Sequence, residues 1–167
     1  MSGQTRKARS HKARNARSAA RLAAVQGLYQ MDMAATDLNV VIHDLTANPI
    51  NETMGGEFSE DEVNSPDPTF LAELLRGVVR RQREIDPMVD NQLAMGWRLA
   101  RVDSILRATL RAGVLELLER PEVPARVVIT EYVDVAKAFF DGEEPKVVNG
   151  VLDKLARKLR PTEFETA

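Results

Sequence analysis

The sequence of 167 residues contains no cysteine. This absence excludes disulfide bonds, a thiol nucleophile and thiolate metal ligands, and it fits a protein of the reducing cytoplasm. No apolar run approaches the roughly 20 residues that a membrane-spanning helix requires. The N-terminus is basic but lacks the apolar segment of a secretory signal. We therefore expect a cytoplasmic protein with no membrane partner.

Histidine and aromatic residues are scarce, with two histidines and eight aromatic residues in the whole chain. His11 lies in a basic segment, and His43, which we interpret as a partly buried structural residue, stands alone in a short apolar one. Neither has the paired spacing of a helical zinc site, and Gly55-Gly56 lacks the Lys-Ser/Thr of a phosphate-binding loop. The acidic residues of 57–62 lack the ligand pattern of a calcium loop. The residues therefore give no case for an enzyme, a metal site or a cofactor.

Positive charge is missing from residues 22–75, which contain ten acidic residues and no lysine or arginine. Residues 1–21 show the reverse, with no acidic residue and seven basic ones: Arg6, Lys7, Arg9, Lys12, Arg14, Arg17 and Arg21. Residues 76–167 are balanced, with 16 basic and 15 acidic residues. This division indicates a cationic arm with an anionic partner, and the alternative is a disordered, solubilising tail.

A nucleic acid is the anionic partner that this arm fits best, because its basic residues recur at intervals of one to four and a partly coiled arm presents most of them to a phosphate backbone. Such contacts supply affinity but little choice of sequence. Choice in single-stranded RNA generally needs stacking on aromatic rings. Tyr29 and Trp97 are the candidates for stacking, and a core or partner-contact role is an equally good interpretation for each.

The apolar residues recur at steps of three and four, the spacing of one helix face. About seven helices are predicted: from about Ala13 with Met33 on its apolar face, over DLNVVIHDL, from Asp67-Pro68 through Val79, around Ile85 to Leu93, from Asp103 to about Arg120, over VPARVVITEYVDVAKAFF, and over 146–160. Asp67 and Asp103 are expected to cap their helices. The Gly-, Pro- and acid-rich segment near 48–67 is predicted to be a loop. The predicted class is all-α.

The dipeptide Asn149-Gly150 is typical of a tight β-hairpin turn. The surrounding apolar residues nevertheless have helical spacing: Val148, Val151, Leu152, Leu155 and Leu159. We therefore predict a helix, although glycine inside a helix costs about 1 kcal/mol relative to alanine. Some other role must favour glycine at this position.

Several segments together resemble the NusB family of bacterial transcription antitermination factors: AARLAAVQGLYQMD, LLRGVV, LRAGVLELLERPEVP, VVITEYVDVAKAFF and, above all, PKVVNGVLDKLARKLRP. The resemblance runs from about Arg14 to Pro161 and is weakest near 48–67. It implies an all-α fold of two packed helical bundles. The expected organisation is a flexible basic arm over 1–13, a single NusB-like domain over 14–161 and a C-terminal tail over 162–167.

The resemblance also implies a function without catalysis or cofactor. Paired with NusE, which is also a small-subunit ribosomal protein, such a factor binds single-stranded boxA RNA in nascent ribosomal RNA transcripts. The complex helps RNA polymerase to read through terminators. The expected partners are therefore boxA RNA, NusE and the RNA polymerase antitermination complex, and self-association into a homodimer is left open.

The RNA-binding residues that the resemblance implies fall in two regions. The N-terminal motif corresponds to Arg14, Arg17, Arg21, Gln26 and Tyr29, and we add Arg9 and Lys12 from the arm. The second region is the start of the last helix, at Glu143, Lys146, Val147 and Asn149. There, Gly150 is expected to allow the close approach of a neighbouring backbone.

Two positions depart from the family pattern. Val147 stands where the family usually has phenylalanine, and a ring that stacks on a base contributes about 1–3 kcal/mol to RNA binding. Thr130 replaces a common asparagine, which we expect to alter a buried or partner-facing hydrogen bond. Other interpretations remain: a NusB-like domain cut from a ribosomal RNA cytosine methyltransferase, a helical module that binds only proteins, or a soluble enzyme.

Overall fold

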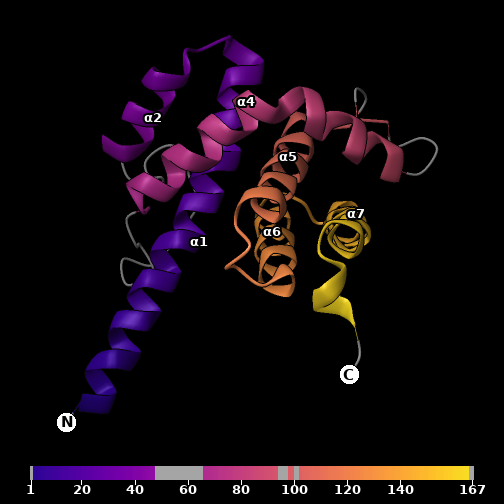
Figure 1. The fold of residues 1–167 in the computed structure, drawn as a ribbon. Helices are drawn as coiled ribbons and strands as arrows, with labels where there is room; N and C mark the ends of the chain where they lie inside the picture. Colours follow the sequence, from indigo (N-terminus) through magenta and orange to yellow (C-terminus); the bar gives the residue numbers. More distant parts are fainter. Residues whose placement is uncertain (1, 48–65, 94–97, 100–101, 166–167) are drawn as a thin grey trace. The chain divides into compact units, whose positions relative to one another are not determined.

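The computed structural model describes residues 2–47, 66–93, 98–99 and 102–165, with the side chains of the first helix described from Ala16 onward. Every regular element in these ranges is helical, which confirms the all-α class (Figure 1). The elements are α1 (Ser2–Ala34), α2 (Leu38–Ala47), α4 (Pro68–Gln92), α5 (Ser104–Glu119), α6 (Ala125–Phe139), α7 (Glu144–Leu159) and the 3₁₀ helix η2 (Pro161–Phe164). No helix among the described residues is long and apolar enough to cross a bilayer.

The chain divides into two compact units, residues 1–75 and 76–167. The sequence predicts one domain over 14–161, but the division falls within the helix α4. Most of the predicted acidic loop at 48–67 lies outside the described residues, and so does Trp97.

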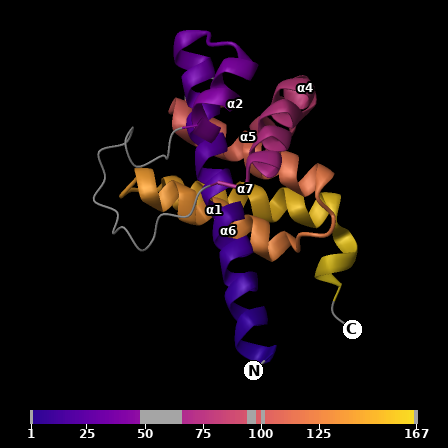
Figure 2. The same ribbon diagram turned by 90° about the vertical axis from the view of Figure 1, so that its left-hand side faces the viewer.

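Unit 1 contains α1, α2 and the first turns of α4. The helix α1 begins at Ser2, earlier than the predicted start near Ala13, so the backbone of the expected arm is helical. The reason is composition: residues 2–34 lack proline and are rich in alanine and arginine, which favour helices. Figure 2 shows α2 beside the C-terminal half of α1.

A glycine allows these two helices to approach closely. A Cβ atom at Gly27 would lie 2.8 Å from the Leu45 side chain and 2.9 Å from that of Val41. Both side chains are buried on α2, one turn apart. Close packing of α1 on α2 therefore depends on the missing side chain at Gly27.

Two predictions about side chains in unit 1 are wrong. Met33 is 63% exposed, because it lies in the last turn of α1, where the helix is about to end. His43 is exposed and not partly buried. It lies two residues from both Val41 and Leu45, which places it on the opposite side of α2 from these buried residues.

The helix α4 is continuous where the sequence predicts two helices, and it runs through Pro87. Its predicted N-cap is confirmed: an Asp67 carboxylate oxygen accepts a hydrogen bond of 3.1 Å from the Phe70 N–H. The prediction that Val79 belongs to the apolar face is wrong, since it is exposed while Val78 is fully buried. The buried face of α4 is therefore narrower at this point than the sequence pattern suggests.

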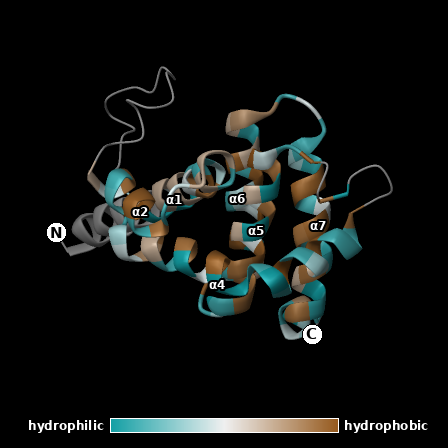
Figure 3. Ribbon diagram, turned by 90° about the horizontal axis from the view of Figure 1, so that it is seen from above, coloured by the Kyte–Doolittle hydropathy of each residue, from teal (hydrophilic) through white to brown (hydrophobic). Residues whose placement is uncertain are grey.

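Unit 2 is built around α5, which is buried along most of its length. Asp103 caps α5 as predicted, accepting a hydrogen bond of 2.8 Å from the Ile105 N–H. The helices α6 and α7 both pack on α5, and their buried residues follow the predicted apolar spacing. Hydrophobic and hydrophilic residues both appear along α7 (Figure 3), and helix continues through Asn149-Gly150 without a turn.

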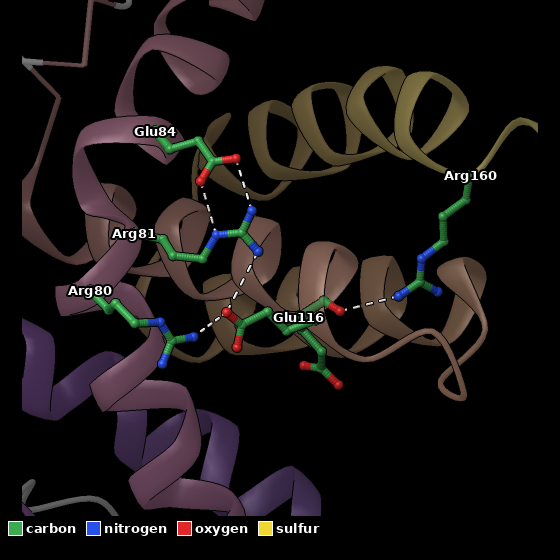
Figure 4. A network of polar contacts seen from close by, with 6 residues as sticks. Arg80, Arg81, Glu84, Glu116 and Arg160 are labelled. Atoms are coloured by element: carbon green, nitrogen blue, oxygen red, sulfur yellow. Dashed lines mark hydrogen bonds and ion pairs between the residues drawn. The ribbon is translucent and has the colours of Figure 1, made fainter.

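Arg160, only 8% exposed, joins the ends of several elements in unit 2. Its guanidinium donates hydrogen bonds to the backbone carbonyl oxygens of Glu116 (3.1 Å), Leu117 (3.0 Å), Arg120 (2.7 Å) and Val123. The first of these is drawn in Figure 4. Carbonyl groups in the last turn of a helix have no partner within the helix. The Glu116 and Arg120 carbonyl oxygens also accept hydrogen bonds from the N–H groups of Arg120 and Val123, so within the described residues it is the Leu117 and Val123 carbonyl oxygens that depend on Arg160 as donor.

The predicted C-terminal tail takes part in the same arrangement. The carboxylate of Glu163, in η2, accepts a hydrogen bond of 3.0 Å from the Ala125 N–H and one of 3.2 Å from Arg160. Ala125 is the first residue of α6, and the N-cap residue Pro124 provides no side-chain hydrogen bond. Glu163 thus replaces the missing cap from a distant part of the sequence.

A second polar network links α4 to α5. Arg81 donates to Glu84 (2.8 and 2.9 Å), and both Arg80 and Arg81 form ion pairs with Glu119 (Figure 4). The hydrogen bond from Arg81 lowers the pKa of Glu84. A lowered pKa stabilises the folded state above the ordinary carboxyl pKa, and that contribution disappears as the pH falls through the lowered value. Arg80 and Glu84 are exposed and Arg81 and Glu119 keep access to solvent, so each pair contributes little to stability.

The hydrogen bonds of Arg160 predict that removal of its side chain destabilises the fold strongly. Arg160→Ala removes the donor of the Leu117 and Val123 carbonyl groups and one of the two donors of the Glu116 and Arg120 carbonyl groups, and we expect it to lower the free energy of unfolding by about 3 kcal/mol or more. Arg157→Ala is the control, because its exposed ion pair with Asp153 and its exposed cation–π contact with Phe164 each contribute less than about 1 kcal/mol. Urea denaturation measures both. Equal small losses for the two variants would contradict this role.

The glycines of unit 2 predict opposite effects of the same substitution. A Cβ at Gly113 would lie 2.8 Å from Leu152, whereas a Cβ at Gly150 would meet no atom of the described chain within 4 Å. We expect Gly150→Ala to stabilise the protein by about 1 kcal/mol and Gly113→Ala to destabilise it by about 1–3 kcal/mol through overpacking. Thermal denaturation distinguishes them, and a loss of stability in Gly150→Ala would show that this space is needed within the fold.

Candidate nucleic-acid interface

The N-terminal basic motif is organised around one aromatic ring. Arg17 and Arg21 lie one turn apart on α1, and each guanidinium carbon is 5.2 Å from the centroid of the Phe70 ring. This is the distance of a cation–π interaction. The Ala16 carbonyl also accepts a hydrogen bond of 3.0 Å from the Asp67 N–H, which fixes the start of α4 beside this part of α1.

The two arginines are not equivalent. Arg21 is only 3% exposed, and Phe70 beneath it is 1% exposed, whereas Arg17 is half-buried. Arg21 therefore belongs to the packed interior of the fold. Arg17 keeps access to solvent and is the better placed of the two to contact a phosphate.

The other residues of this motif lie further along α1 or nearer its start. Gln26 is buried, and its Oε1 accepts no hydrogen bond from the described residues. Tyr29 is half-buried. The backbone of Arg9, Lys12 and Arg14 is helical, and their side chains lie outside the described part. The helical register places Arg14, Arg17 and Arg21 on one face, at positions i, i+3 and i+7.

The second predicted region lies at the start of α7 and carries more negative than positive charge. Three acidic residues, Asp141, Glu143 and Glu144, accompany the single base Lys146. The Nζ atom of Lys146 lies 3.6 Å from a Glu143 carboxylate oxygen, and both side chains are at least 70% exposed. An exposed pair of this kind is weak, so a phosphate group can replace Glu143 at little cost.

The remaining predicted features of this region show what α7 offers to a partner. Asn149 is exposed and Val147 half-buried. The close approach of a neighbouring backbone that is expected at Gly150 is not made by the described part of this chain, since no atom beyond the surrounding helix lies within 4 Å of where its Cβ would be. Thr130 on α6 is exposed, which places it outward and not in a buried hydrogen bond.

Sequence reasoning missed a hollow in unit 2 that is lined by charged residues of α4, of α5 and of the connection between them, including Asp86, Asp90, Arg98 and Arg111. Its charges are engaged with one another. Arg111 donates two hydrogen bonds to Asp86 (2.8 and 2.9 Å), and Arg98 pairs with Asp90 at 3.4 Å. Within the described ranges, no group of three histidine or acidic residues is placed to hold a metal ion.

The unequal burial of the two arginines predicts unequal effects on folding. Arg21→Ala removes a desolvated cation–π contact and buried packing, and we expect it to lower the free energy of unfolding by about 2 kcal/mol. Arg17→Ala should cost less than about 1 kcal/mol. Urea denaturation compares the two. If Arg17→Ala were the more damaging variant, the assignment of Arg21 to the interior would be wrong.

Comparison with known proteins gives consistent matches. The model of the NusB family matches residues 18–157. The transcription antitermination protein NusB of Rhodopseudomonas palustris (strain BisB18) is 51% identical over 150 residues, which cover 90% of this chain and 86% of the relative. The corresponding protein of Bradyrhizobium diazoefficiens is 48% identical over 90% of this chain and 88% of its own length.

Solved structures agree with the sequence comparison. The structure of T. maritima NusB has a TM-score of 0.70 at 26% identity and covers 90% of this chain and 97% of its own. A structure of the antitermination factors NusB and NusE with double-stranded RNA has a TM-score of 0.65 at 25% identity, covering 86% and 97%. The chain therefore belongs to the NusB family, which consists of transcription antitermination factors and not of enzymes.

Proposed function

We propose that this protein is a transcription antitermination factor that binds single-stranded boxA RNA together with NusE. The observation that carries the proposal is the 51% identity, over 90% of the chain, to a transcription antitermination protein NusB. A structure similar to this one contains NusB, NusE and RNA. The methyltransferase alternative loses support, because the matched relatives are NusB proteins and the chain covers 86–88% of their length.

The first contact in this proposal is electrostatic. Arg17 and the basic residues that precede it on α1 face phosphate groups, and Arg21 stacked on Phe70 holds this part of the helix in place. A continuous helix from Ser2 presents the cations at fixed intervals. Phosphate contacts of this kind provide affinity that decreases with salt but little sequence preference.

Sequence preference is assigned to the start of α7 and to the partner. Lys146 exchanges Glu143 for a phosphate, and the exposed side chain of Asn149 contacts a base edge. Val147 cannot stack on a base as an aromatic ring does, so the affinity of this chain for RNA alone is low. NusE supplies the missing contacts, and the complex acts on nascent ribosomal RNA with RNA polymerase.

A binding titration tests the proposal. It uses a short boxA RNA and a scrambled RNA, each with and without NusE, at several salt concentrations. We expect preference for boxA that increases with NusE. Arg17→Gln and Lys146→Gln should each reduce the slope of log affinity against log salt by about 0.7, the value for one phosphate contact on a single strand. Lys137→Gln, which removes an exposed charge on α6, is the control.

The result that opposes the proposal is equal, weak binding to both RNAs in every mixture. The protein would then be a module that binds only proteins. Light scattering of the same samples measures whether the free protein is a monomer or a homodimer, which determines the concentration of binding-competent chains.

A further inference from the structure

We propose that RNA bound at the start of α7 continues along one edge of this helix, past Gly150 to Lys154 and Lys158. The inference rests on the proposed function and extends its second contact region toward the C-terminal end of α7. We call Gly150, Lys154 and Lys158 the lysine edge. Its members follow one another at steps of four residues, so they form a row along the helix.

The lysine edge differs from the neighbouring exposed side of α7 in that its positive charges form no ion pairs within the described part of the chain. On that side, Asp153 pairs with Arg157 at 3.0 Å, and the Arg157 guanidinium carbon lies 4.7 Å from the centroid of the Phe164 ring. Lys154 and Lys158 are both exposed, and neither forms an ion pair within the described part of the chain. One side of α7 is thus neutralised by its own residues, and the other is cationic.

The positions around the two lysines give them no partner within the helix. Gly150 and Val151 occupy the positions four and three residues before Lys154, and Arg157 and Lys158 occupy those three and four residues after it. Like charges at this spacing destabilise a helix slightly. Lys158 lies in the last turn, where a cation is favoured by the helix dipole, but Lys154 lies before that turn. A bound anion accounts for both residues.

Gly150 adds a steric argument to the electrostatic one. Beyond the surrounding helix, no described atom lies within 4 Å of the position where its Cβ would be, so no packing within the described residues requires glycine there. A glycine without an internal reason marks a place where another backbone approaches closely. The rise of 1.5 Å per residue makes Lys146 and Lys158 about 18 Å apart along the helix, which is long enough for several successive phosphates.

The test uses the full chain with NusE and two boxA-like RNAs, one short and one extended by a few nucleotides at either end. The double variant Lys154→Gln/Lys158→Gln is compared with Arg126→Gln/Lys137→Gln, which removes two exposed charges from α6. We expect the first double variant to lose the affinity gained from the longer RNA and to reduce the salt slope by about 1.4, twice the value for one contact. The control should keep both.

Gly150→Leu tests the steric part separately. It adds a bulky side chain without changing charge, so we expect weaker binding of the longer RNA at an unchanged salt slope. Melting temperatures and NusE binding without RNA are measured for every variant. Unchanged values show that the folded protein and its protein partner are not affected.

The outcomes separate this inference from the proposed function. One outcome is that the wild type prefers boxA while the lysine variant binds the short and the extended RNA as tightly as the α6 control variant does. In that case the lysine edge is not an RNA surface, and the proposed function stands. If the lysine variant loses NusE binding in the absence of RNA, the edge contacts a protein and the inference is wrong. If the wild type shows no boxA preference, the proposed function fails and the inference fails with it.

Discussion

The arrangement of unit 2 depends on the buried guanidinium of Arg160. One side chain donates to carbonyl groups at the end of α5 and in the connection to α6, and it also pairs with Glu163, which caps the start of α6. A planar guanidinium with five donors can satisfy these groups together, whereas a lysine cannot. Because Arg160 immediately follows α7, these bonds also fix the end of the helix that carries one of the candidate RNA-binding regions.

Helix positions in this protein could largely be predicted from the sequence, because their signals are local. The apolar period identifies α5, α6 and α7, and capping by Asp67 and Asp103 is visible within three residues of each cap. The errors at Met33 and Val79 occur where the apolar signal ends at a helix end or at the edge of a face. The sequence pattern also does not predict the start of α1 or the continuity of α4 through Pro87. The role of Arg160 could not be predicted, since its carbonyl partners lie 37 to 44 residues away in the sequence.

The candidate site shows a similar limit. A count of charges treats the basic residues of α1 alike, but packing against Phe70 places Arg21 in the interior and leaves Arg17 accessible. Near α7, the sequence shows acidic residues around Lys146. It does not show that Lys146 forms an exposed ion pair with Glu143, in which a phosphate group can replace the carboxylate. The sequence already shows that Gly150 is unusual within a helix. The structure changes the interpretation of this glycine, because the space beside it is open to a partner.

The proposed RNA-binding surface is tested by photo-crosslinking of a 4-thiouridine boxA RNA to the protein in the presence of NusE, with the crosslinked peptides identified by mass spectrometry. We expect crosslinks in the region around Arg17 on α1 and from Glu143 along α7, and we expect their loss when unlabelled boxA RNA competes. Crosslinks confined to α2 and α6, or crosslinks that scrambled RNA removes equally well, would contradict the proposed surface.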